Sequence, residues 1–165
     1  MQTKTELTPA IEQHFLTLIA KLSTIFGLLF ITDSIYTLIE SIFPDSTWLK
    51  IIVGTFGLIL FIAMGVSLFK DLKFQGKLNR KTLWYGKFTD EYISYASMKG
   101  YQYSWNVMSI LLPILLILAG LNERVEYLPE FLSSIPILEF IKLNFAILML
   151  SYGLPILYML RREQD

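Results

Sequence analysis

Three long stretches of the chain contain no charged residue at all. They cover residues 51–69, 100–122 and 143–160, with lengths of 19, 23 and 18 residues. A helix that crosses the ~30 Å hydrocarbon core of a bilayer needs ~20 mostly apolar residues. The whole chain is also poor in charge, at 17%, where a soluble domain has roughly a quarter. We therefore predict an all-α integral membrane protein in contact with the lipid bilayer.

A fourth apolar stretch lies at residues 15–43, and it does not have the form of a signal peptide. It is long, Lys21, Asp33 and Glu40 interrupt it, and no small-residue cleavage site follows it soon after. Thr8 and Pro9 are typical of a helix start. The sequence therefore predicts a four-helix transmembrane bundle forming a single domain, 1–165. Its helices are expected at about 9–42, 48–69, 90–121 and 137–161, with a loop at 70–89.

Basic residues are unevenly divided between the two sides of this arrangement. Eleven of the 14 Lys and Arg residues fall in 1–21, 70–102 and the last five positions. The positive-inside rule then places both termini and the 70–89 loop in the cytoplasm, and we expect a bacterial inner membrane. The formal net charge is zero, which argues against nucleic acid as a partner.

The third predicted helix begins with an unusually polar segment, 89–106. Thr89 is expected as its N-cap, with acids in the first turn where they suit the helix dipole. Ala96 and Gly100 would admit a close helix neighbour. One interpretation is an interfacial stem whose tyrosines lie at headgroup level. The other is a cytoplasmic docking face formed by Asp90, Glu91, Tyr92, Tyr95 and Lys99.

This segment also resembles a signature of small bacterial multi-pass membrane proteins whose function is unassigned. The resemblance lies in Asp90-Glu91, Ile93, Lys99-Gly100 and Tyr103-Ser104, directly before a membrane helix. Those proteins carry Arg where this chain has Tyr92, and Ala where it has Gly100. The resemblance implies the multi-pass architecture and no catalytic activity.

Polar residues within the apolar helices are candidates for function. Asp33 falls near the middle of a crossing at 22–42, and it shares a helix face with Tyr36 and Glu40. An ionisable residue in a membrane helix is by default a functional hypothesis. Three interpretations stay open: ion or proton handling, a packing contact with a Ser, Thr, Asn or Tyr of a neighbouring helix, or a position nearer water.

Two further helices share a Ser-x-x-x-Pro pattern, at Ser109 and at Ser151. Each proline removes the hydrogen bond to the serine carbonyl four residues earlier. The pattern indicates either a pair of hinges beside a cavity or ordinary packing kinks. Asn106 and Asn144 lie in the same helices, and we expect them to bond between helices rather than to bind a ligand.

No pattern of catalytic residues is present in the sequence. The chain has no cysteine and one histidine, so neither a thiolate nor a multi-histidine metal site is expected, and no cofactor. The prediction is a non-enzymatic accessory, regulatory or protective protein that binds a membrane-protein partner or forms a homo-oligomer. The alternative is an oligomeric ion channel or small transporter that uses Asp33 and the proline-kinked helices.

Overall fold

The computed structural model describes residues 8–75, 88–122 and 137–162, and every regular element in them is a helix. The helices are α1, Pro9–Ile42; α2, Thr47–Gln75; α4, Glu91–Asn122; and α6, Ile137–Arg162. The all-α prediction is therefore confirmed for these residues. The predicted connection at 123–136, and residues 76–87 of the predicted loop, lie outside them.

One predicted boundary is wrong. The loop was expected to begin at residue 70, but α2 continues through Gln75. The segment Lys-Asp-Leu-Lys-Phe-Gln contains neither proline nor glycine before Gly76. Because lysine, leucine and glutamine are good helix formers, charge alone does not end the helix there.

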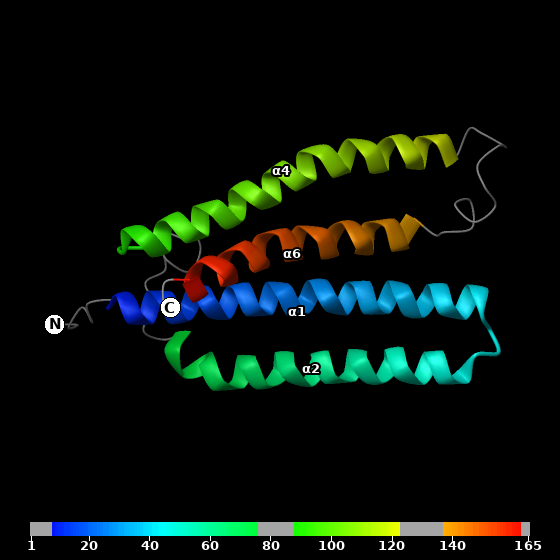
Figure 1. Ribbon diagram of the computed structural model, residues 1–165, viewed down its shortest axis with the longest axis horizontal. Coiled ribbons are helices and arrows are strands. Elements are labelled where there is room, and N and C mark those ends of the chain that lie inside the picture. The colour runs from blue at the N-terminus through cyan, green and yellow to red at the C-terminus, as the bar shows by residue number, and fades with distance from the viewer. Residues whose placement is uncertain (1–7, 76–87, 123–136, 163–165) are drawn as a thin grey trace.

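The four helices lie side by side in the order α2, α1, α6, α4 (Figure 1). α1 packs against α2 on one side and against α6 on the other, while α4 packs mainly on α6. The beginnings of α1 and α4 and the end of α6 lie at one end of the molecule, which we call the terminal end. The turn at 43–46, the end of α4 and the beginning of α6 lie at the opposite end, the turn end. α4 and α6 diverge toward the turn end (Figure 1).

Small residues allow α1 and α6 to pack very closely. A Cβ atom placed on Gly153 would lie 2.5 Å from Oγ1 of Thr24 and 2.6 Å from the carbonyl oxygen of Ala20. One placed on Gly27 would lie 2.9 Å from the carbonyl oxygen of Ala146. Real Cβ contacts are longer than these distances, so glycine is required at both positions. We call this close contact the α1/α6 seam.

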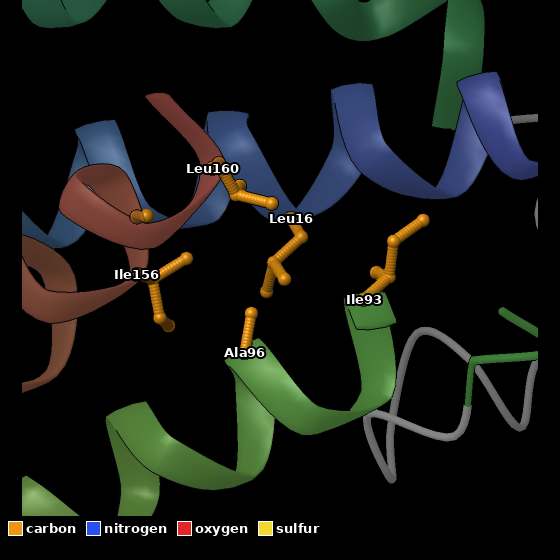
Figure 2. Close-up of a cluster of buried hydrophobic side chains, with 6 residues drawn as sticks. Leu16, Ile93, Ala96, Ile156 and Leu160 are labelled. Atoms are coloured by element: carbon orange, nitrogen blue, oxygen red, sulfur yellow. The ribbon is translucent and has the colours of Figure 1, made fainter. Parts of the chain in front are cut away.

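At the terminal end, α4 joins the seam to form a three-helix core. Its side chains interlock between the helices (Figure 2); they are Leu16, Ala20, Ile93, Ala96, Ile156 and Leu160. A Cβ on Gly100 would lie 2.5 Å from Cδ1 of Ile156. The prediction that Ala96 and Gly100 admit a close neighbour is confirmed, and that neighbour is α6.

Three of the helices are long and apolar enough to cross a membrane, judged over the described residues. They are represented by Pro9–Glu40, Thr47–Phe69 and Leu138–Arg162. Within α2 the most apolar window has no buried residue. The exposed side chains of residues 47–69 are almost all hydrophobic, Trp48, Ile52, Phe61 and Phe69 among them.

Replacing Gly153 with alanine is expected to lower stability by about 1–3 kcal/mol, because the new methyl group overlaps the backbone of α1. The matched control is Gly65→Ala in α2, where a Cβ would meet nothing within 4 Å and the gain in helix propensity should leave stability equal or higher. Thermal unfolding in detergent, followed by circular dichroism, compares the two. Equal melting temperatures would contradict the close seam.

Candidate functional site

A buried carboxylate joins α1 to the beginning of α4. Glu12 has no exposed surface, and both of its oxygens accept from the backbone N–H of Thr89 at 2.9 Å. The Thr89 hydroxyl donates to Oε1 at 2.7 Å, and the N–H of Asp90 donates to Oε2 at 3.1 Å. Glu12 therefore binds the N-terminus of α4 as an anion does, through otherwise unpaired donors.

The true N-cap of α4 is Asp90, so the prediction of Thr89 is wrong by one position. Oδ1 of Asp90 accepts from the N–H groups of Tyr92 and Ile93, at 2.9 and 3.0 Å. The hydroxyl of Thr89 donates to Glu12. Asp90, and not Thr89, therefore accepts from the N–H groups in the first turn of α4.

The five residues of the predicted docking face divide into two groups. Asp90 serves as the cap, and the Tyr92 hydroxyl donates to the carbonyl of Met159 in α6 at 2.8 Å. Glu91 and Tyr95 are exposed. Lys99 lies 5.5 Å from the centre of the Tyr95 ring and donates to Gln102 at 3.0 Å. Of the five predicted residues, Glu91, Tyr95 and Lys99 are therefore the ones left on the surface without a contact to another helix in these bonds.

A second group of charges lies between α1 and α6, closer to the turn end. Nζ of Lys142 donates to Oδ2 of Asp33 at 2.6 Å and to Oε1 of Glu139 at 2.8 Å. The side chains of Lys142 and Glu139 are 20% and 10% exposed, whereas that of Asp33 is 57% exposed. We call these three residues the charged cluster. Within it, one ammonium group bridges two carboxylates on different helices.

The register of the seam brings these charges together. Toward the turn end, contacts between the two helices follow antiparallel order: Ala20 with Gly153, Gly27 with Ala146, Phe30 with Phe145, and Asp33 with Lys142. Glu139 precedes Lys142 by three positions, so both lie on the same face of α6. The apolar seam thus ends in the charged cluster.

Three buried oxygens near the turn end have no hydrogen-bond partner in the described part of the chain. They are Oγ of Ser34, Oε2 of Glu139 and Oδ1 of Asn144. Taken as whole residues, Ser34 and Glu139 are each 8% exposed. Leaving a buried polar atom unpaired costs about 1–3 kcal/mol, so Glu139 leaves the charged cluster incompletely satisfied within the described residues.

A groove runs beside Asp33 between α1 and α2. Its volume is about 360 Å³, and its walls are Leu29, Thr32, Asp33, Tyr36, Val53, Gly54, Gly57, Leu58 and Phe61. The predicted companions of Asp33 separate here. Tyr36 shares the groove, but Glu40 accepts from Lys50 of α2 at 3.4 Å, farther toward the turn end.

The pairing of α1 with α2 also fixes how far Asp33 lies along the molecule. Glu40 lies beside Lys50, and Thr32 lies beside Gly57. Asp33 is therefore level with a point about six residues beyond Lys50, or ~9 Å along α2. Since the uncharged run of α2 continues to residue 69, Asp33 is level with the third of that run nearest the turn end. Its position near the middle of a crossing at 22–42 stays a prediction.

The remaining predicted polar residues do not join Asp33. Asn106 and Ser109 are exposed on α4, and the Ser109 hydroxyl donates to the carbonyl of Asn106 at 2.9 Å. The Ser151 hydroxyl likewise bonds within its own helix, to the carbonyl of Leu148 at 3.0 Å. Both helices continue past their prolines.

A second cavity, of about 290 Å³, lies between α1, α4 and α6 nearer the terminal end. Apolar side chains make up most of its wall, together with Ser23, Ser97, Ser104, Tyr101 and Tyr152. In the described residues, no group of three or more His, Asp or Glu side chains is arranged to hold a metal ion.

Sequence reasoning missed Glu12 entirely and used Lys142 only to assign sides of the membrane. One signal for Lys142 was present: a lone base three positions after an acid, at the start of an apolar helix. Glu12 resembles an ordinary first-turn acid, which suits the dipole of its own helix, and no local signal shows that it binds another.

Comparison with known proteins gave no match to a family model, a curated protein or a solved structure. The resemblance at residues 90–104 stays a prediction, and the functional argument rests on the geometry.

Replacing Glu12 with alanine should destabilise the start of α4, because three donors of Thr89 and Asp90 lose a charged acceptor. Each such bond contributes about 1.5–3 kcal/mol, so a loss of at least about 2 kcal/mol is expected. Hydrogen exchange should show faster amide exchange in the first turns of α4. Glu91→Ala, at an exposed acid of the same turn, is the control, and equal exchange in both variants would contradict the role of Glu12.

Replacing Lys142 with methionine leaves two carboxylates between α1 and α6 without their shared cation. We expect the free energy of unfolding to fall by about 2–4 kcal/mol. This value lies toward the low end of the cost of breaking a buried ion pair, because Asp33 is partly exposed. Lys50→Met, which breaks a longer and more exposed pair, should cost less than about 1 kcal/mol. The triple variant Asp33→Asn, Glu139→Gln, Lys142→Met should recover most of the melting temperature; failure to do so would show that charge is not the cause.

Proposed function

We propose that this chain is an integral protein of a bacterial inner membrane, crossed by all four helices with both termini in the cytoplasm. Three described helices have the length and apolarity that a crossing requires. The uncharged run 100–122 supplies the fourth, within α4. The terminal end, where most of the basic residues gather in the sequence, then faces the cytoplasm by the positive-inside rule.

Within the bilayer, we propose that the protein acts by binding another membrane protein, in an accessory, regulatory or protective role. The observation that carries this proposal is the groove between α1 and α2. It places the polar side chains Thr32, Asp33 and Tyr36 beside an otherwise apolar helix. Lipid tails cannot satisfy such groups, and membrane helices associate through them. The groove is therefore suited to a protein partner.

The packing of the chain favours this role over ion conduction by a single molecule. At the α1/α6 seam, side chains and backbone meet with no room for an added methyl group. The charges nearest the seam bond to one another between helices of the same chain. A conducting path would have to form between copies, as the oligomeric alternative requires.

The proposal is also non-enzymatic. A catalytic site at the terminal end would need His14, Asp90 and Glu91 to converge in a cleft. Asp90 is instead used as the cap of α4, and His14 and Glu91 are exposed side chains on different helices.

A photo-crosslinking experiment in cells tests the proposal. A photoreactive phenylalanine at Phe61, in the groove wall, should give a discrete adduct with a second protein, identified by mass spectrometry. The same residue at Trp105, exposed on α4, is the control and should not give that adduct. An adduct of two copies would indicate a homo-oligomer, and ion flux in liposomes holding such oligomers would favour the channel. Absence of any specific adduct at Phe61 would count against a partner in the groove.

A further inference from the structure

The charged cluster carries one more negative charge than positive. Asp33 and Glu139 share the single ammonium group of Lys142, which gives the three side chains a formal charge of −1. The other charged pair near this end, Glu40 and Lys50, is neutral by itself. Oε2 of Glu139 also has no partner. The described part of the chain therefore leaves a carboxylate without a full counter-charge among apolar helices.

That excess charge is accessible from one direction. Glu139 is buried, and the side chain of Lys142 is only 20% exposed. Asp33, in contrast, is more than half exposed and forms part of the groove wall between α1 and α2. A cation that completes the cluster can therefore reach Asp33, and the groove is a route that places it beside that carboxylate.

The depth of the groove favours a helix over a lipid headgroup as its occupant. Asp33 lies ~9 Å farther along the molecule than Lys50, which begins the charge-free run of α2. A headgroup amine stays at the level of the membrane surface, whereas a side chain on a crossing helix can lie at this depth. Gly54 forms part of the opposite wall, and a Cβ there would meet nothing within 4 Å, so a partner backbone can approach closely.

The chemistry of the groove fits a basic side chain. A guanidinium group binds a carboxylate through two parallel hydrogen bonds. The ring of Tyr36, in the same groove, can contact a cation through its face. A second copy of the chain is a poorer candidate, because the described bases toward the turn end, Lys50 and Lys142, are already bonded to acids.

We propose that the groove between α1 and α2 binds a membrane helix of a different protein through an Arg or Lys that pairs with Asp33. The inference rests on the proposed partner-binding function and names the chemistry of the partner.

The probe is a synthetic polyleucine membrane helix with one arginine, placed about six residues from its outer end to match the depth of Asp33. The full chain is reconstituted in phosphatidylcholine liposomes and labelled at Ser46→Cys in the turn 43–46, since the natural sequence has no cysteine. Energy transfer to a labelled peptide measures binding. The arginine helix should bind about tenfold more tightly than the same helix with leucine.

Two variants assign this preference to the groove. Asp33→Asn should abolish the preference for arginine, while Glu40→Gln, which removes a nearby acid already paired with Lys50, should retain it. Gly54→Leu fills the groove at an open position and should weaken the binding of both peptides without lowering the melting temperature. If Asp33→Asn folds poorly, Gly54→Leu still tests whether the peptides bind in the groove.

Equal binding of the arginine and leucine helices would overturn the inference, and so would a preference that survives Asp33→Asn. Displacement of the arginine helix by phosphatidylethanolamine would also overturn it, because a lipid amine would then be the occupant. If Asp33→Asn leaves the crosslinked partner at Phe61 unchanged, the proposed function stands and the inference alone fails. If no partner is captured at Phe61 while the arginine preference holds, the proposed function fails.

Discussion

The close contact of α1 with α6 determines the rest of the structure. Gly27 and Gly153 bring two helices together at distances that no larger residue would permit. Among membrane helices, association depends on packing and polar contacts, because lipid is as apolar as the side chains it would replace. The seam therefore fixes the register of the two helices, and the register fixes which side chains meet beyond it. Asp33 faces Lys142 because Gly27 faces Ala146.

The remaining two helices attach to this pair in different ways. α4 is joined by the terminal-end core and by Glu12, whose carboxylate binds the N–H groups of Thr89 and Asp90 directly before that helix. α2 packs on α1 and has no buried residue in its apolar window. On one side of the row, a buried carboxylate holds the start of α4. On the other side, α2 is joined to α1 by the exposed Lys50–Glu40 pair and presents an apolar helix with a polar groove along its inner edge.

Much of the fold follows from local sequence, and the site does not. The bounds of α1 follow from Pro9 and from Pro44, and Ala96 and Gly100 indicated a close neighbour because small residues have few other roles there. The bonds of Glu12 and Lys142 join residues 77 and 109 positions apart. Such bonds depend on helix rotation and register, which are set by the seam as a whole. The end of α2 shows the same limit at short range. The charge at Lys70 indicated the end of the helix, but the helix propensity of residues 70–75 carries α2 on to Gln75.

The charged cluster also connects stability with function. A carboxylate in a membrane helix is costly unless it is paired, and here two carboxylates share one ammonium group. If stability alone were selected, an asparagine in place of Asp33 would remove the excess charge and keep a polar group against Lys142. Among the described residues, the aspartate at this position therefore leaves one carboxylate charge unmatched. Under the proposed function, a cationic partner would supply the missing counter-charge on binding, so this excess charge would contribute to affinity for the partner.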